Sequence, residues 1–373
     1  MNRIIIINAT ATKKGGALTI LKEYINELKK NNNDKYYIFC GADIDYNEND
    51  LIKLIKIKTD GVGAFGIKRI YWDFFGLFYY CKRNNIKPDL IISFQNTGVF
   101  FPKKKQLIYF HQPIPLYNFK WNLFSKSEAV FYFYKKIYPF FVRLLISNKT
   151  TFVVQLNFIK KLFVDKFKIN SNKVYVIKPN VNAIDKSNLS LELDKSYYHI
   201  FYPTSFAKYK NVSILLDAME ILKKENKEAF SNIKLHITLR RDNKELNRII
   251  NKKEINSAID LTGIISFQEV NSYYQNIDLM VFPSYIETFG LPLAEAANIG
   301  LPIIASDMEY SREVLDKYSG VSYATYNNPL EWAHKILKNY NNRGRFKPIN
   351  NDINYNSWRQ FIELSNSIID QNV

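Results

Sequence analysis

Residues 279–307, LMVFPSYIETFGLPLAEAANIGLPIIASD, restrict the possible folds of this chain more than any other part of its sequence. Apolar runs at 279–282 and 302–305 are typical of two buried strands. A helix is predicted between them, beginning at Pro292 and stopping at Gly300, because proline is common in the first helical turn and glycine just after the last. Buried strands that alternate with helices indicate a parallel α/β sheet.

Two carboxylates, Glu287 and Glu295, lie eight positions apart in this stretch, one in the loop and one in the first turn of the predicted helix. In open parallel sheets, ligands bind outside the carboxyl ends of the strands. A helix N-terminus at that edge favours anionic groups such as phosphate. Proline, glutamate and glycine are also ordinary helix punctuation. The spacing alone therefore leaves both a binding role and a purely structural role open.

The length and composition predict a folded protein with two domains. A chain of 373 residues suits two domains of about 150–200 residues each. The only cysteines, Cys40 and Cys81, have no metal-ligand spacing, so we expect free thiols in a reducing compartment. The first apolar run has four residues, too short for a signal peptide, and no run approaches a membrane span. We therefore expect a cytoplasmic location.

The net charge of +17 lies entirely in the first half of the chain. Residues 1–180 carry 30 Lys and Arg against 12 Asp and Glu, whereas residues 181–373 carry 22 against 23. The densest part is 100–150, where aromatic residues are interleaved with lysines and the single acid is Glu128. Such a segment fits nucleic acid, an anionic membrane surface, or helices with aromatic residues in the core and solvated lysines. We favour contact with the inner face of the cell membrane.

Short apolar runs alternate with helical patterns in both halves, which is typical of doubly wound parallel sheets. Strands of the first half are predicted at 3–9, 36–40, 90–94, 107–110, 151–154 and 174–177. Strands of the second half are predicted at 199–202, 234–239, 259–262, 279–282 and 302–305, and a helix is predicted at 270–276. We predict a first Rossmann-like domain over 1–181, a linker over 182–197, a second Rossmann-like domain over 198–350, and a last segment over 351–373 that contains a helix at 357–370.

The string from Glu287 through Phe-Gly-Leu-Pro to Glu295, with its Gly-Leu-Pro-Ile-Ile-Ala-Ser-Asp tail, closely resembles the donor-site signature of retaining glycosyltransferases of family 4, the glycosyl transferases group 1. Such enzymes have the GT-B fold, with two Rossmann-like domains, the active site in the cleft between them, and a last helix that crosses back to the first domain. The resemblance is strong over 261–315 and weaker in the first domain. It implies transfer of a sugar from a nucleotide diphosphate to a hydroxyl, with retention of configuration.

The resemblance assigns donor-binding roles around the signature. Glu295 is expected to accept hydrogen bonds from the ribose diol. Glu287 is expected to hold the sugar and to stabilise developing positive charge, together with the backbone amides of Phe289, Gly290 and Leu291. Gly263, at the start of the region of strong resemblance, is assigned to the same donor site. Thr288 stands where many members have glycine, a departure that bears on the sugar preference.

Lys210 falls on the family lysine that supports the leaving diphosphate. A flexible ammonium at a helix N-terminus suits that role as a point charge. An isolated lysine is more often a solvated surface residue, but its place between a strand and a helix favours the binding role. Family members have an arginine where this chain has Ser205. We therefore expect a weaker phosphate clamp, or one that Arg240 or Arg241 completes.

The first domain offers less specific positions. Gly15 and Gly16 precede a helix after the first strand, where backbone can approach a ligand closely; in the family this loop meets the donor phosphates or the acceptor. His111 follows a predicted strand, as the family histidine does, and is expected to hydrogen-bond the donor sugar or polarise the transition state. An isolated histidine is more often structural. No metal motif occurs, so the reaction is expected to need neither metal nor cofactor.

The acceptor implied by the family and by the basic first half is a saccharide, in particular a lipid-linked oligosaccharide of a surface polysaccharide such as O-antigen or capsule. Two alternatives stay open. One is another enzyme on the same fold, such as a sugar-nucleotide epimerase or a phosphorylase, although no pyridoxal lysine is recognisable. The other is a nucleic-acid-binding protein that uses the basic half. Because nucleic-acid binding leaves the carboxylate pair unexplained, we expect no nucleic-acid partner.

Overall fold

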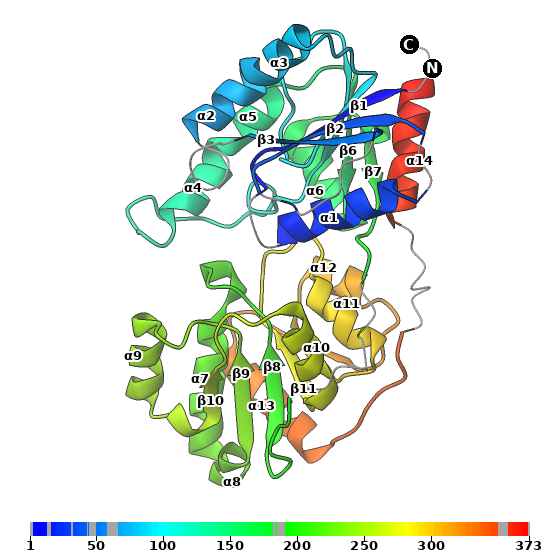
Figure 1. Ribbon diagram of the computed structural model, residues 1–373. Helices are drawn as coiled ribbons and strands as arrows, with labels where there is room; N and C mark the ends of the chain where they lie inside the picture. Colours follow the sequence, from blue (N-terminus) through cyan, green and yellow to red (C-terminus); the bar gives the residue numbers. More distant parts are fainter. Residues whose placement is uncertain are drawn as a thin grey trace. The chain divides into compact units, whose positions relative to one another are not determined.

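A computed structural model describes residues 3–12, 16–30, 33–42, 44, 50–57, 66–181, 184, 191–349 and 357–371 of the chain. The chain divides into two compact units. Unit 1 comprises Met1–Asn180 and Tyr355–Val373, and unit 2 comprises Val181–Asn354. Each unit has its own parallel sheet and its own covering helices (Figure 1).

The described residues of unit 1 form a sheet of seven strands in the order β3-β2-β1-β4-β5-β6-β7, and all its neighbouring strands pair in parallel. The strand order reverses between β1 and β4, which makes the carboxyl ends of these two strands a topological switch point where ligands commonly bind. The strands are β1 (Ile4–Ala9), β2 (Lys35–Cys40), β3 (Ile52–Lys56), β4 (Leu90–Ser93), β5 (Lys105–Tyr109), β6 (Thr150–Val154) and β7 (Val174–Val176).

Helices cover both faces of this sheet, so its strands alternate between two cores. On β1, Ile5 and Ile7 pack into a core that includes Tyr24 and Trp358, whereas Ile6 packs on the opposite side with Trp72. The helices of unit 1 are α1 (Gly16–Leu28), α2 (Ile67–Tyr71), the π turn η1 (Trp72–Gly76), α3 (Leu77–Arg83), α4 (Ala129–Lys136), α5 (Tyr138–Leu144), α6 (Asn157–Phe167), the 3-10 turn η2 (Ser171–Lys173) and α14 (Ser357–Asp370).

The last helix, α14, packs beside α1 on unit 1 (Figure 1). Its bounds are those predicted from the sequence, and its Trp358 and Phe361 rings lie 5.3 and 5.4 Å from the ring of Tyr24. The Lys105 ammonium donates hydrogen bonds to the Ile368 and Ile369 carbonyls at the end of α14, at 2.9 and 3.2 Å. Lys105 therefore stabilises a helix C-terminus, a role that the sequence reading of the basic segment 100–150 missed.

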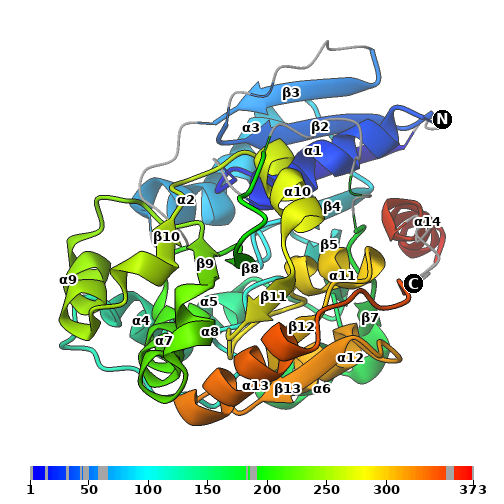
Figure 2. The ribbon, with the colours of Figure 1, turned by 90° about the horizontal axis from the view of Figure 1, so that it is seen from below.

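In the described part of unit 2, six strands form a parallel sheet in the order β10-β9-β8-β11-β12-β13, with its switch point between β8 and β11. Figure 2 shows α7 and α13 side by side on this unit, where they pack against each other. The strands are β8 (Tyr198–Tyr202), β9 (Ile233–Ile237), β10 (Ile259–Leu261), β11 (Leu279–Phe282), β12 (Ile303–Ser306) and β13 (Val321–Ala324). The helices are η3 (Lys208–Lys210), α7 (Val212–Glu225), α8 (Lys227–Ser231), α9 (Lys244–Lys253), η4 (Asn256–Ala258), α10 (Phe267–Asn276), α11 (Leu291–Asn298), α12 (Glu309–Val314) and α13 (Pro329–Asn341).

The predicted fold class, two doubly wound parallel sheets, is confirmed by these topologies. Several predicted boundaries were wrong by one to three residues. The helix after β11 begins at Leu291 and not at Pro292, so Glu295 is its fifth residue and lies beyond the first turn. The strand β3 was not predicted. Half of the predicted linker 182–197 lies outside the described residues, because only 184 and 191–197 of it are described.

Candidate functional site

Two loops meet at the switch point of unit 2, one after β8 and one after β11. The first leads through the 3-10 turn η3 to Asn211, whose φ of 57° puts it in the left-handed region just before α7. Asparagine tolerates this conformation better than most residues do, because its short side chain can bond to nearby backbone. The second loop, residues 283–290, connects β11 to α11. Both loops therefore leave the carboxyl edge where open α/β sheets bind ligands.

Hydrogen bonds hold these two loops together. The backbone N–H of Tyr285 donates to the carbonyl of Tyr209 at 3.0 Å. The Asn211 amide donates to the carbonyls of Pro283 and Tyr326, at 3.3 and 2.7 Å. Because the bonds run between backbone groups or from a short amide, the two loops keep a fixed spacing, which is a requirement for a preorganised site.

Lys210 and Glu287 form an ion pair across the two loops. The Lys210 ammonium lies 2.5 Å from Glu287 Oε1, and the two side chains are 18% and 14% exposed. The lysine also faces the rings of Tyr209 and Phe282, at 5.5 and 5.9 Å from their centroids. Burial pushes the pKa of Lys210 down, but the adjacent Glu287 carboxylate and Tyr209 act more strongly, so its pKa is raised. Lys210 is therefore a firmly charged cation in a partly dry environment, as binding an anionic group requires.

The N-terminus of α11 opens next to this pair. Gly290 precedes the helix with a φ of +90°, a conformation that L-amino acids with side chains rarely adopt. The glycine thus allows the chain to turn sharply into the helix, whose first amides carry the positive end of the helix dipole. Phe289 is buried, whereas Leu291 is half-buried. A cation and a helix N-terminus at one strand end form an arrangement that suits an anion such as a diphosphate.

Glu295 lies in the body of α11 and is 9% exposed. Its Oε2 accepts a hydrogen bond of 2.9 Å from the hydroxyl of Tyr274 in α10. Burial, followed by the charge of Glu295, raises the pKa of Tyr274 well above its usual value, so the tyrosine acts as a donor. The sequence reading missed Tyr274. Its only signal was a Tyr-Tyr pair in a predicted helix, which is more often core packing than a site.

The other predicted residues of unit 2 lie at separate loop positions. Ser205 is exposed after β8. Arg240 is also exposed and pairs with Asp242 at 2.9 Å, whereas Arg241 Nε donates to the Leu261 carbonyl at 3.0 Å. Gly263 has a φ of +90°, and a Cβ added there would meet no atom within 4 Å. Arg240 therefore has its partner in the β9–α9 loop, and Arg241 has its partner at the end of β10. Neither arginine bonds to Lys210 or Glu287.

Of the predicted site residues in unit 1, the structure describes His111 and Gly16. His111 follows β5, and its backbone N–H donates to Asn96 Oδ1 at 2.5 Å. Its Nδ1 atom is buried and makes no hydrogen bond of good geometry with the described residues. Burial lowers the pKa of His111 to about 4, so the ring is neutral near pH 7. Gly16 is the first residue of α1, whereas Gly15 lies outside the described residues.

Neither a metal cluster nor a membrane-spanning helix occurs in the described part of the chain. No three or more His, Cys, Asp or Glu side chains of these residues are grouped so that they could hold a metal ion. None of the helices described is both long enough and apolar enough to cross a bilayer. The described residues at the site of unit 2 offer the Lys210 ammonium, the carboxylates of Glu287 and Glu295, the Tyr274 hydroxyl and backbone amides.

Comparisons with known proteins relate the chain to glycosyltransferases. Residues 184–358 match the family model of the glycosyl transferases group 1. The O-antigen chain mannosyltransferase RfbU of Salmonella typhimurium is 24% identical over 243 residues, which cover 63% of this chain and 65% of RfbU. The chain thus spans just under two thirds of the length of that relative.

Two solved structures are similar over nearly the whole chain. WaaG, a glycosyltransferase involved in lipopolysaccharide biosynthesis, has a TM-score of 0.70 at 12% identity, with 99% of this chain and 100% of WaaG covered. HepE of Anabaena, in complex with UDP and glucose, has a TM-score of 0.63 at 14% identity, with 98% and 100% covered. Similarity at such low identity shows a shared fold, and the predicted GT-B fold is confirmed.

Proposed function

We propose that the chain, whose residues 184–358 match the family model of the glycosyl transferases group 1, transfers a sugar from a nucleoside diphosphate to a saccharide acceptor with retention of configuration. The observation that carries this proposal is the ion pair of Lys210 and Glu287 beside the N-terminus of α11. A charged lysine and a helix N-terminus suit the diphosphate of the donor. The UDP and glucose in the HepE complex are ligands of the same chemical class.

In the proposed reaction, the donor diphosphate binds to Lys210 and to the backbone N–H of Leu291, the first residue of α11. The next residue, Pro292, has no N–H, and the N–H of Leu293 donates to the Gly290 carbonyl at 2.9 Å. The ribose diol donates hydrogen bonds to Glu295, whose orientation Tyr274 holds. The sugar lies against Glu287 and the amides of Phe289 and Gly290. Glu287 therefore has two roles in this arrangement. It contacts the sugar, and before the donor binds it keeps Lys210 charged and in place.

The bond between the anomeric carbon and the diphosphate oxygen breaks while the acceptor hydroxyl forms its bond on the same face of the sugar. Negative charge grows on the leaving diphosphate, where Lys210 and the helix dipole stabilise it. A diphosphate oxygen takes the proton of the acceptor hydroxyl, so no enzyme nucleophile is needed. His111, neutral near pH 7, can bond to the sugar as a donor or acceptor.

The stereochemical claim has a direct test. The product is expected to keep the anomeric configuration of the donor, and turnover is expected to be unchanged in a chelator, because a lysine and a helix N-terminus here fill the role that a metal fills elsewhere. Proton NMR of the product, and initial rates with and without chelator, measure the two outcomes. An inverted product would contradict the retaining mechanism, and a rate that only magnesium or manganese restores would contradict metal independence.

For the acceptor we propose a lipid-linked saccharide of a surface polysaccharide, such as O-antigen or capsule, used at the inner face of the membrane. The names of RfbU and WaaG support this class of product. A second support is a pair of exposed apolar rows on the helices of unit 1. One row has four-residue spacing along α2–α3, and the other has three- and four-residue spacing along α4–α5: Ile67, Tyr71, Phe75 and Tyr79; Val130, Phe133, Ile137, Phe140 and Leu144.

Such rows are unusual on a soluble surface, where exposed apolar residues normally occur singly. Spacing of three and four residues puts the second row on one side of a helix. Exposed basic residues accompany the rows, namely Lys68, Lys126, Lys136 and Arg143. An apolar face rimmed with cations fits the boundary of an anionic bilayer, where each nearby basic residue adds ~1 kcal/mol.

We expect the protein to sediment with anionic vesicles, to be released as salt rises, and to ignore neutral vesicles. Phe133→Ser combined with Phe140→Ser should reduce the bound fraction, and so should Lys126→Glu combined with Lys136→Glu. Leu330→Ser and Lys252→Glu are matched controls, since both residues are exposed on unit 2 outside the rows. Equal binding to neutral and anionic vesicles, or none to either, would show that this face is solvated or contacts a protein.

A further inference from the structure

A buried ion pair lies at the switch point of the unit 1 sheet, far along the chain from the donor residues. Arg69 and Asp73 are 4% and 6% exposed, and Arg69 Nε lies 3.5 Å from Asp73 Oδ2. Asp73 belongs to the π turn η1, which interrupts the helical run from α2 to α3. π turns are rare and are found frequently at functional sites. The pair is not part of the predicted donor machinery.

Asp73 connects the two strands that flank the switch point. Its Oδ1 accepts hydrogen bonds from the Asn8 amide at 3.0 Å and from the Gln95 amide at 3.3 Å. Asn8 is in β1, and Gln95 lies two residues after β4. Trp72, the residue before Asp73, donates from Nε1 to the Asn8 side-chain oxygen at 3.1 Å. The π turn thus presents two consecutive side chains to the ends of β1 and β4.

Gln95, which bonds to Asp73, also bonds to the residues that follow β1. With its amide nitrogen facing Asp73, its oxygen accepts from the backbone N–H of Ala11 at 2.8 Å and from the Thr10 hydroxyl at 3.1 Å. A further bond, from the Thr12 N–H to the Ala9 carbonyl at 2.9 Å, closes a turn. The carboxylate therefore fixes the orientation of the Gln95 amide, and Gln95 fixes the turn 9–12 that leads toward α1.

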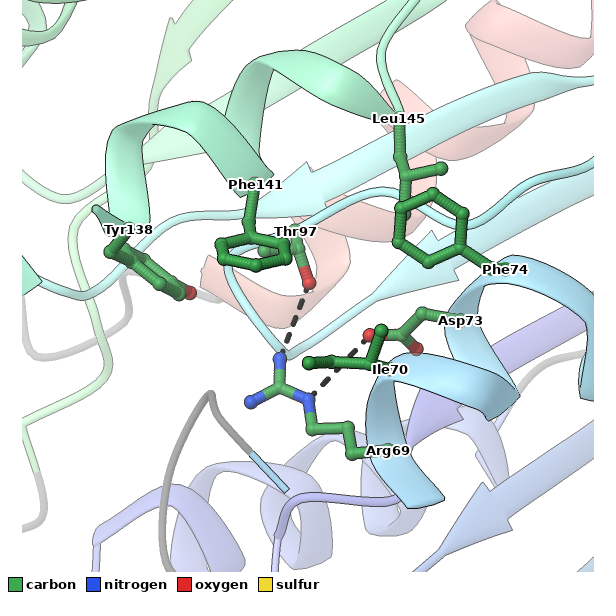
Figure 3. Close-up of a pocket in the computed structure, with 8 residues that line it drawn as sticks. All are labelled: Arg69, Ile70, Asp73, Phe74, Thr97, Tyr138, Phe141 and Leu145. Carbon is green, nitrogen blue, oxygen red and sulfur yellow. Dashed lines mark hydrogen bonds and ion pairs between the residues drawn. The ribbon is translucent and has the colours of Figure 1, made fainter. Parts of the chain in front are cut away.

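Arg69, the other member of the ion pair, bonds to the segment that follows β4. Figure 3 shows its guanidinium directed from α2 toward Thr97, within a pocket that Tyr138 and Phe141 of α5 also line. One Arg69 amino group donates to Thr97 Oγ1 at 3.2 Å and to the Gln95 carbonyl at 3.0 Å. The Tyr138 hydroxyl donates to the same Gln95 carbonyl at 3.1 Å, so both ends of Gln95 are held.

Stability does not explain why charged groups are used here. Removing a carboxylate and a guanidinium from water costs several kcal/mol per ion, and replacing a buried ion pair by apolar residues of similar volume is often neutral or stabilising. Consistent with that cost, burial raises the pKa of Asp73, and Arg69, Asn8 and Gln95 act in the opposite direction. A pair that costs free energy but fixes one backbone geometry is expected where that geometry serves a ligand.

We propose that Asp73 is a positioning residue, which acts through Gln95 to hold the turn 9–12 at the carboxyl edge of unit 1 in the conformation that binds the acceptor. This inference rests on the proposed glycosyl transfer and assigns the acceptor side of the reaction to this edge. The donor residues belong to unit 2 and make none of these contacts. Disturbing Asp73 should therefore change acceptor use and leave donor binding intact.

Two variants separate positioning from folding. The double variant Arg69→Met with Asp73→Leu replaces both charged side chains by apolar ones, so the fold is expected to survive. Gln95→Met keeps the ion pair but removes the bonds to Thr10 and Ala11. The matched control is Gln106→Met: Gln106 is equally buried and bonds to the Val99 backbone at 2.9 Å, but it is the second residue of β5 and lies at the amino edge.

The readouts are melting temperature, hydrogen exchange of Ala11, and steady-state kinetics with donor and acceptor varied separately. We expect Ala11 to exchange about tenfold faster in Gln95→Met, and kcat/KM for the acceptor to fall about 10- to 100-fold in both test variants. The donor KM should stay within about twofold of wild type. Gln106→Met should lower the melting temperature and leave the acceptor KM and the exchange of Ala11 unchanged.

Folded test variants with wild-type acceptor kinetics would overturn the proposal, as would a loss of activity in Gln106→Met as large as in Gln95→Met. If the double variant does not fold, Gln95→Met decides alone. A wild-type protein that transfers no sugar would contradict the proposed function. A wild-type protein that transfers sugar, with test variants that have wild-type kinetics, would contradict only the positioning role of Asp73. Unchanged exchange of Ala11 in Gln95→Met would contradict the positioning role in either case.

Discussion

Lys210→Met is expected to lower kcat/KM for sugar transfer by about 100- to 1,000-fold, the range seen when a group that stabilises developing negative charge is removed. The methionine keeps the length and the apolar stem of lysine, so the rings of Tyr209 and Phe282 retain their packing partner. What is lost is the cation beside the leaving diphosphate. Steady-state rates of nucleoside diphosphate release, with donor varied at saturating acceptor, measure the effect.

Lys208→Met is the matched control for this prediction, because Lys208 is exposed in the same 3-10 turn. It should leave the rate within about twofold of wild type. Glu287→Ala removes the other member of the ion pair and should mainly slow turnover, by about 10- to 100-fold. Wild-type kinetics in Lys210→Met, or an equal loss in Lys208→Met, would remove Lys210 from the reaction.

Glu295→Ala is expected to weaken nucleoside diphosphate binding by about 10- to 100-fold, because a charge-assisted hydrogen bond is worth ~1.5–3 kcal/mol. Tyr274→Phe should have a smaller effect in the same direction, since it leaves the carboxylate in place but removes the 2.9 Å bond that orients it. Titration calorimetry with UDP and with GDP, two probes that differ in the base, measures both variants. Both should remain folded by circular dichroism.

The contrast between the two glutamates is the informative part of this experiment. Glu295 is assigned to binding and Glu287 to turnover, so Glu295→Ala should change the dissociation constant, and Glu287→Ala mainly kcat. A Glu295→Ala protein that binds both nucleotides with wild-type affinity would contradict the assignment of the ribose site. So would a Glu287→Ala protein that loses binding but keeps kcat.

The local pattern of apolar residues was sufficient to predict most strands of unit 2. The strand Leu279–Phe282 has its predicted bounds, and α10, predicted at 270–276, begins earlier at Phe267. The error at α10 came from overlooking its capping box, in which Ser266 and Glu269 bond to each other's backbone N–H. Such a box is a local signal that the sequence already contains. The doubly wound topology followed from strand and helix alternation, and it is correct in both units.

The side-chain pairings that could not be predicted from the sequence join residues that are distant along the chain. The pairing of Lys210 with Glu287 joins positions 77 residues apart, and that of Asn8 with Asp73 joins positions 65 apart. Asp73 follows Lys68 and Arg69 in a segment that resembles an ordinary amphipathic helix, and no local rule turns its carboxylate inward. The π turn that does so is set by packing of Trp72 against the sheet, which is a tertiary effect.

Sugar transfer by the purified protein tests the central claim most directly. A panel of nucleotide sugars that varies base and sugar is incubated with the protein and with lipid-linked saccharide acceptors, and nucleoside diphosphate release and sugar incorporation are measured together. The account predicts that one donor gives both signals in wild type and that Lys210→Met and Glu295→Ala reduce both. The absence of transfer from every donor, or transfer that neither variant changes, would contradict it.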